Sequence, residues 1–135
     1  SVVGHVVFTG SPSPRWAPLQ EFAGGLGLGD RIHFLPNLSD LELACLYRHG
    51  RATAVISPSE GFSLPVLESL ACGTTPIVTA DSAQSEVAGD FGVQVPAGNH
   101  LALVEALNNL LAAPPIVQPD AIQHARSFTW DRTAQ

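Results

Sequence analysis

Two glutamates with seven residues between them, Glu60 and Glu68, lie where a predicted strand gives way to a helix. The apolar run 53–56 predicts a buried strand, and Pro65 suits the first turn of the helix that follows. Four backbone N–H groups emerge between strand and helix with no partner inside the helix, those of Gly61, Phe62, Ser63 and Leu64. A helix start of this kind is an anion site in outline.

The two carboxylates constrain what such a site could hold. A carboxylate beside a phosphate is repelled, so each glutamate needs a neutral polar target such as a sugar or ribose hydroxyl. Glu60 precedes the helix, whereas Glu68 lies roughly 6 Å farther along its axis, at a rise of 1.5 Å per residue. A ligand that spans both would be a nucleoside diphosphate sugar. The alternative is an ordinary strand, turn and helix with both glutamates in solvent.

Short apolar runs alternate with longer helical patterns, which is typical of a parallel sheet with helices on both faces. Strands are predicted at residues 2–8, 32–35, 52–56, 76–79 and 92–95. Helices are predicted at residues 15–26, 41–49, 64–72, 82–88, 100–112 and 119–127. The pattern therefore predicts an α/β fold with one core, and 135 residues suffice for one domain.

Local signals mark several of these helix ends. Ser39 and Glu42 have the spacing of a capping box, and Asn99 suits the N-cap of its helix. Gly73 is expected to stop the helix that carries Glu68. The glycines within 24–29 follow a helix rather than a strand, so they predict a helix end and not a dinucleotide-binding loop.

The segment EGFSLPVLE, followed by SLACGT, resembles the E-x7-E signature of retaining GT-B glycosyltransferases of the family 4-like, group 1 type. Further segments resemble the C-terminal, donor-binding domain of that family in order: LGLGDRIHFLP at 26–36, LSDLELACLY at 38–47, EVAGD at 86–90 and FTWDRTA at 128–134. The resemblance implies that residues 1–135 form one Rossmann-like nucleotide-sugar-binding domain. This would be the C-terminal half of a GT-B fold without its first strand.

The resemblance also implies residue roles. Glu60 would be the catalytic residue that contacts the donor sugar, Glu68 would bind the ribose hydroxyls, and the amides between them would bind the diphosphate. The strand ends at Gly10 and at Pro36 and Leu38 would share the crevice, the latter near the nucleotide base. The reaction implied is transfer of a sugar from a nucleotide-diphosphate sugar with retained configuration, and it needs no metal or other cofactor.

Three departures from the family bear on activity. Ser63 stands where the family more often has a second glycine. The chain resembles the family only from a point after the strand whose loop supplies an arginine and a lysine to the diphosphate, and it contains no lysine. The acceptor-binding N-terminal domain of the family is expected to lie outside these residues. We therefore expect an inactive isolated chain, and unpaired sheet edges that lower stability or promote self-association.

Composition limits other functions. A net charge of −6 opposes nucleic-acid binding, and no apolar run approaches the roughly 18 residues of a membrane span. A soluble, cytoplasmic setting is the expectation. Cys45 and Cys72 are predicted to be buried free thiols, and the histidines show no metal-binding spacing. Phe128 and Trp130 are expected to pin the C-terminal tail.

Two alternatives stay open, a non-catalytic nucleotide-binding or interaction module and a GT-B epimerase or phosphorylase relative. Retention of both glutamates opposes the first alternative, and the absence of lysine opposes a phosphorylase with pyridoxal phosphate. The sequence leaves the sugar, the acceptor and the base open, with UDP, GDP and ADP as candidate nucleotides.

Overall fold

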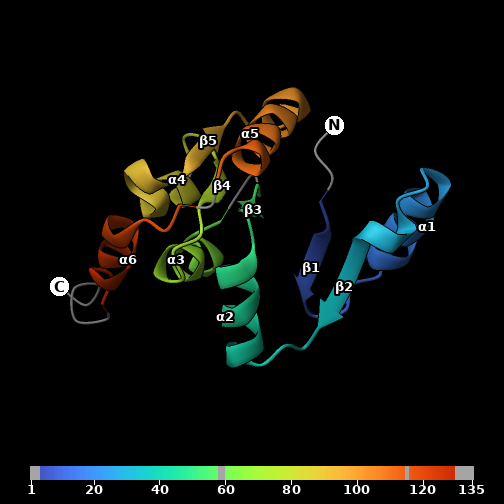
Figure 1. Ribbon diagram of the computed structural model, residues 1–135, viewed down its shortest axis with the longest axis horizontal. Coiled ribbons are helices and arrows are strands. Elements are labelled where there is room, and N and C mark those ends of the chain that lie inside the picture. The colour runs from blue at the N-terminus through green and yellow to red at the C-terminus, as the bar shows by residue number, and fades with distance from the viewer. Residues whose placement is uncertain (1–3, 58–59, 115, 130–135) are drawn as a thin grey trace. The chain divides into compact units, whose positions relative to one another are not determined.

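The computed structural model describes residues 4–57, 60–114 and 116–129 (Figure 1). Its strands are β1 (Val6–Gly10), β2 (Ile32–Pro36), β3 (Thr53–Val55), β4 (Pro76–Thr79) and β5 (Val93–Val95). Its α-helices are α1 (Trp16–Gly25), α2 (Asp40–His49), α3 (Leu64–Ala71), α4 (Ala83–Ala88), α5 (His100–Ala112) and α6 (Pro119–Arg126). Two short 3-10 turns, η1 (Gly29–Arg31) and η2 (Gly89–Phe91), complete the order. Every predicted element is confirmed in type, although β1 begins at Val6, and residues 2 and 3 lie outside the described ranges. The strand predicted to be buried at 53–56 is partly exposed, with Ala54 exposed in β3.

The chain divides into two compact units, residues 1–43 and 44–135, which we call the N-terminal and C-terminal units. The boundary falls within α2. In the N-terminal unit, β1 and β2 pair in parallel with Val6 opposite Ile32. Phe34 of β2 lies 5.1 Å from the ring of Trp16 at the start of α1, and this aromatic contact packs the helix on the two strands.

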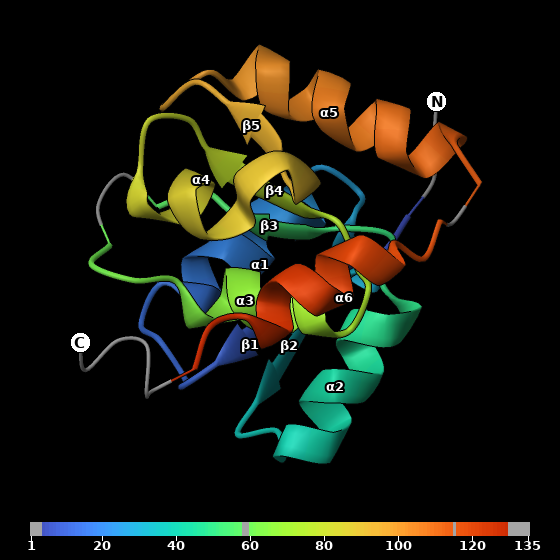
Figure 2. The same cartoon turned by 90° about the vertical axis from the view of Figure 1, so that its left-hand side faces the viewer.

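The C-terminal unit is built on a parallel sheet in the order β3-β4-β5. All four residues of β4 are buried, as expected for a central strand covered on both faces. Val78 packs in a core cluster with residues of α3, α4 and α6, whereas the neighbouring Ile77 packs with Ala106 of α5. Figure 2 shows α5 on one side of this sheet and α3 and α6 on the other. The predicted Rossmann-like architecture, with helices on both sheet faces, is thereby confirmed.

The helix ends follow the predicted local signals. The Ser39 hydroxyl and amide both donate to the Glu42 carboxylate, at 2.6 and 2.8 Å, and these bonds lower the pKa of Glu42. The Asn99 side chain accepts from the amide of Ala102 at 3.1 Å, which caps α5. Gly73, at φ +79°, ends α3 with a left-handed conformation that favours glycine.

The strand edges can be described within each unit. Among the described strands of its own unit, β1 pairs with β2 alone and β3 pairs with β4 alone. Val6 and Val7 of β1 are 50% and 38% exposed. Self-association through such an edge stays a prediction.

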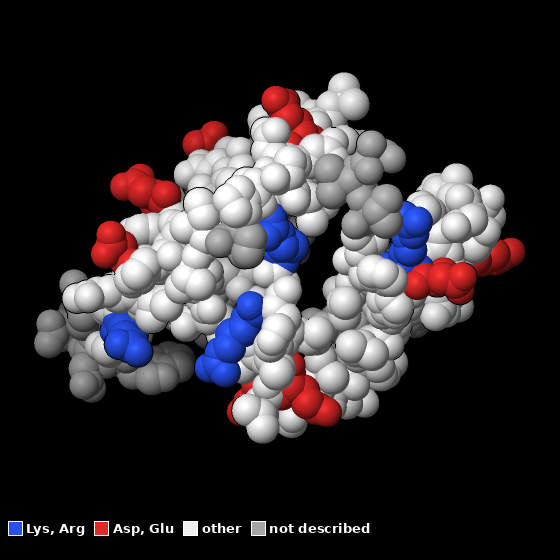
Figure 3. Space-filling model, viewed as in Figure 1, with Lys and Arg blue, Asp and Glu red and all other residues white. Residues whose placement is uncertain are grey.

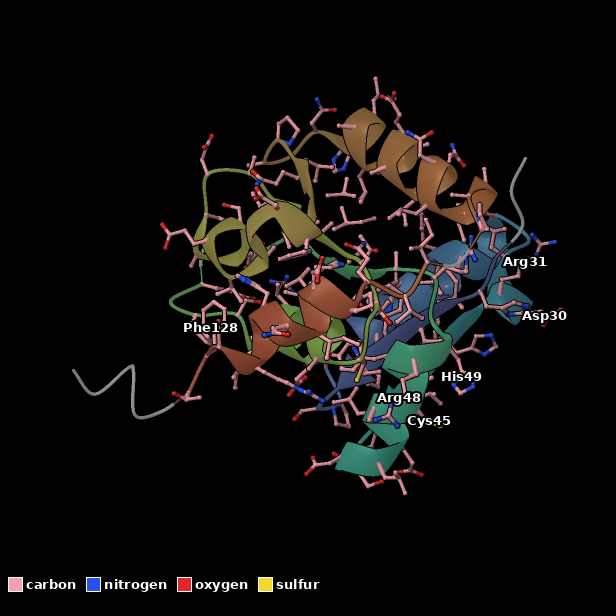
Figure 4. All side chains as sticks on the ribbon, turned by 60° about the vertical axis from the view of Figure 1, so that its left-hand side comes forward. Asp30, Arg31, Cys45, Arg48, His49 and Phe128 are labelled. Carbon is pink, nitrogen blue, oxygen red and sulfur yellow. The ribbon has the colours of Figure 1, made fainter. Side chains whose placement is uncertain are left out.

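The prediction of buried thiols is wrong. Both cysteines are free, but Cys45, labelled in Figure 4, is exposed on α2. Cys72 is only half-buried at the end of α3. The partly buried stripe of α2 contains Leu43, Leu46 and Tyr47, with helical spacing, and Cys45 lies off this stripe. The apolar residues next to the cysteines in the sequence therefore did not predict whether the thiols are buried.

Candidate functional site

The loop between β3 and α3 carries most of the predicted site residues. Glu60, Gly61 and Phe62 are exposed, and Ser63, the N-cap of α3, is fully buried. Leu64 begins the helix, with Pro65 in its first turn as predicted. The predicted order of loop, helix start and helix is thus confirmed, while the roles of these residues stay predictions.

The start of α3 presents unused backbone donors. The amide of Leu67 donates to the oxygen of Ser63 at 3.2 Å, and Pro65 has no N–H. Across the part of the chain that the structure describes, the amides of Leu64 and Val66 donate to no acceptor. The helix dipole adds partial positive charge at the same place, so this helix start favours an anion.

Ser63 has an unusual hydroxyl. Its side chain does not cap α3, and its Oγ is buried without a hydrogen-bond partner among the described residues. Buried polar groups are nearly always satisfied, and an unsatisfied one costs about 1–3 kcal/mol. At the start of α3, the Ser63 hydroxyl and the amides of Leu64 and Val66 therefore all lack hydrogen-bond partners among the described residues.

Glu68 lies one turn into α3, on the exposed face of the helix. The buried face consists of Val66, Ser69 and Leu70. Because the Cα–Cβ bonds of a helix tilt toward its N-terminus, the Glu68 side chain leans toward the helix start. The Cα–Cβ bond of Glu68 thus tilts toward the helix start, and its carboxylate lies on the solvent-exposed face of α3.

Tyr47 is a site residue that sequence reasoning missed. Its hydroxyl donates a hydrogen bond to Oε2 of Glu68 at 3.0 Å. Burial raises the pKa of the half-buried Tyr47 phenol, and the charge and hydrogen bond of Glu68 raise it further. The signal available in the sequence was that Tyr47 is the one tyrosine of the chain, at the end of the LSDLELACLY segment.

The side chain of Gln84 in α4 binds the backbone just after β3, where the chain leaves the sheet. This buried side chain donates from Nε2 to the oxygen of Ser57 at 3.0 Å and accepts at Oε1 from the amide of Thr79 at 3.2 Å. The Thr79 hydroxyl also donates to Ser57, at 3.3 Å. The segment after β3 is therefore tied to the end of β4.

A series of ring contacts reaches the loop from the other end of the chain. Phe62 lies 6.1 Å from Phe128, which makes an edge contact with His124 of α6 at 5.2 Å. The Nε2 atom of His124 is 2.9 Å from the oxygen of Val87. Phe128, labelled in Figure 4, thus holds the tail to the domain as predicted, while Trp130 lies outside the described residues.

The other predicted site residues belong to the N-terminal unit. Gly10 and Pro36 are the last residues of β1 and β2 and lie opposite each other in register. Leu38 is in the loop after β2, following Asn37 at φ +55°. The structure brings these strand ends together with one another. That they share a crevice with Glu60 stays a prediction.

The described residues offer few groups for a metal or a polyanion. No cluster of three or more histidine, cysteine or acidic side chains in them could hold a metal ion. The arginines on the face seen in Figure 3 form separate spots rather than one basic patch. Among the helices described, none is both long and apolar enough to cross a membrane.

The C-terminal unit, with its parallel sheet covered by helices on both faces, has the Rossmann-like fold of GT-B glycosyltransferases. Residues 3–128 match the family model described as Glycosyl transferases group 1, and the chain belongs to this family. It is 36% identical over 139 residues to a D-inositol 3-phosphate glycosyltransferase from Salinispora tropica, a match that covers 96% of this chain and 29% of that protein. The chain thus spans about three tenths of the length of this relative.

Solved structures share the fold at low sequence identity. The sucrose-phosphate synthase of Thermosynechococcus elongatus aligns with a TM-score of 0.83 and 24% identity, over 97% of this chain and 36% of that one. HepE from Anabaena, solved in complex with UDP, aligns with a TM-score of 0.74 and 18% identity, over 92% of this chain and 35% of that one. The family and fold predicted from the sequence are confirmed.

Proposed function

We propose that this chain is the donor-binding part of a retaining glycosyltransferase that transfers a sugar from a nucleoside diphosphate sugar to an acceptor. Membership of the group 1 family supports a glycosyl transfer. The observation that carries the donor-binding role is the start of α3 between Glu60 and Glu68, where the amides of exposed Leu64 and buried Val66 donate to no acceptor among the described residues. The acceptor would be bound by a further domain of the intact protein.

In this proposal the diphosphate lies at the start of α3. As the bond between sugar and diphosphate breaks, negative charge grows on the departing phosphate oxygens. The amides and the dipole of α3 stabilise that charge without proton transfer by the protein. Ser63 occupies the position where the family more often has glycine, and its buried Oγ has no hydrogen-bond partner among the described residues.

The two glutamates then contact the neutral parts of the donor. Glu60, exposed in the loop before the helix, accepts hydrogen bonds from the donor sugar. Glu68, one turn into the helix, accepts them from the ribose hydroxyls. UDP is the first nucleotide to test, because the similar fold of HepE was solved with UDP, and GDP and ADP follow. No metal or other cofactor is proposed, and the expected setting is cytoplasmic.

The direct test is calorimetric titration of the chain with UDP, GDP and ADP. We expect one nucleotide to bind selectively, and Glu68→Ala to weaken that binding by about ten- to a hundredfold. Glu105→Ala, which removes an exposed carboxylate of α5, is the matched control and should leave the affinity unchanged. The absence of binding at millimolar nucleotide, or equal binding by the Glu68→Ala variant, would contradict the proposed site.

A further inference from the structure

We propose that Tyr47 is a positioning residue for nucleotide binding, because its hydroxyl holds the Glu68 carboxylate in the orientation that receives the ribose hydroxyls. The inference rests on the proposed function. It adds a residue of α2 to a site otherwise formed by the loop after β3 and by α3. Tyr47 and Glu68 both belong to the C-terminal unit.

The hydrogen bond joins an anchored side chain to an exposed one. The Tyr47 hydroxyl is 3.0 Å from Oε2 of Glu68, at the long end of the range for an O–H···O hydrogen bond. An exposed glutamate without a partner populates several side-chain conformations, and a ligand that needs one of them must pay the entropy of selecting it. The bond from Tyr47 selects one conformation before the ligand arrives.

Tyr47 is itself held in place by the C-terminal end of α3. Its main-chain oxygen accepts a hydrogen bond from the hydroxyl of Thr74, which is buried. The oxygen of Thr74 in turn accepts from the hydroxyl of Ser69, a buried residue of α3, at 2.9 Å. The residue that orients Glu68 is therefore fixed to the same helix that carries Glu68.

The carboxylate keeps enough acceptor capacity for a diol. An ionised carboxylate has about four lone-pair positions, and the Tyr47 hydroxyl occupies one of them at Oε2. Oε1 and the second position on Oε2 stay available for two adjacent hydroxyls. The Tyr47 phenol is protonated, and hence a donor, throughout the neutral range, because its ordinary pKa of 10.0 is raised further by burial and by Glu68.

The test compares UDP with 2′,3′-dideoxy-UDP, which lacks the ribose diol, on the full chain by calorimetry. The wild-type chain should bind UDP more tightly than the analogue. Tyr47→Phe, which keeps the ring and removes the hydroxyl, should weaken UDP binding by about two- to tenfold and leave the affinity for the analogue unchanged. Ser85→Ala, which removes a hydroxyl hydrogen bond from α4, is the control and should change neither affinity.

The outcomes separate this inference from the proposed function. If the wild-type chain distinguishes the two ligands and Tyr47→Phe distinguishes them equally well, the role of Tyr47 is overturned while the nucleotide site stands. Equal weakening of both ligands would indicate a structural role and would also overturn the inference. A wild-type chain that binds neither ligand would overturn the proposed function and the role of Tyr47 with it.

Discussion

Gln84 and Ser57 are joined across 27 residues of sequence by a 3.0 Å hydrogen bond from the side-chain amide to the main-chain oxygen. Gln84 is only 1% exposed, so a polar side chain is buried here to bind backbone groups of two strand ends. The start of the loop that leads to Glu60 is therefore held by α4 as well as by the sheet.

Gln84→Leu should lower the free energy of unfolding of the chain by about 1–3 kcal/mol, because it leaves the oxygen of Ser57 and the buried amide of Thr79 with fewer partners. Urea unfolding followed by circular dichroism measures the change. Gln123→Leu, at an exposed position of α6, is the control and should have a much smaller effect. Equal effects of the two variants would show that the buried amide contributes little.

Gly73→Ala should also destabilise the chain, by about 1 kcal/mol or more, because position 73 has a positive φ and an added Cβ would lie 3.2 Å from Val117. Gly24→Ala is the matched control, and its expected change in stability has the opposite sign. Gly24 is inside α1, and an added Cβ there meets nothing within 4 Å, so alanine should stabilise the helix by about 0.5–1 kcal/mol. Thermal unfolding compares the two, and stabilisation by both would contradict the backbone argument.

The two glutamates should have separable kinetic effects in the intact enzyme. Glu60→Ala should lower kcat more than it lowers nucleotide affinity, since its proposed contact is with the sugar that is transferred. Glu68→Ala should chiefly weaken donor binding, by about ten- to a hundredfold, as expected for hydrogen bonds to a charged group. Steady-state kinetics of sugar transfer measure both parameters. If both variants change both parameters equally, the division of roles is wrong.

The stability of the chain should depend on Tyr47 at alkaline pH. Burial raises the pKa of Tyr47 in the folded state above its ordinary value of 10.0, so the unfolded chain loses the phenol proton first. The contribution of this group to stability is complete below about pH 10 and is lost as the pH rises toward the folded pKa. Urea unfolding between pH 8 and pH 11, as an approximate range, should show a steeper loss for the wild-type chain than for Tyr47→Phe. Parallel profiles would contradict this.

The elements of the fold were predictable because their signals are local. Gly73 ends α3, Asn99 caps α5, and the apolar run at β4 indicates a strand covered on both faces. The place of Glu60 and Glu68 around the start of α3 followed from the same short segment.

The contacts that organise the site were not predictable, since they join residues far apart in sequence. Tyr47 meets Glu68 across 21 residues, and Gln84 meets Ser57 across 27. Such pairs depend on how helices pack on the sheet, which the periodicity of each element does not encode. The same reason explains the error at Cys45, whose exposure is set by the face that α2 turns to its neighbours.

Because Phe62 contacts Phe128, a change made just after α6 can affect the loop that carries Phe62. A variant cut before residue 128, or a bulky tag fused directly behind it, alters the support of a loop more than sixty positions earlier. Expression boundaries for binding studies should therefore include Phe128 and leave a spacer after it. Otherwise a weak nucleotide affinity could result from the truncation and not from the residues of the loop.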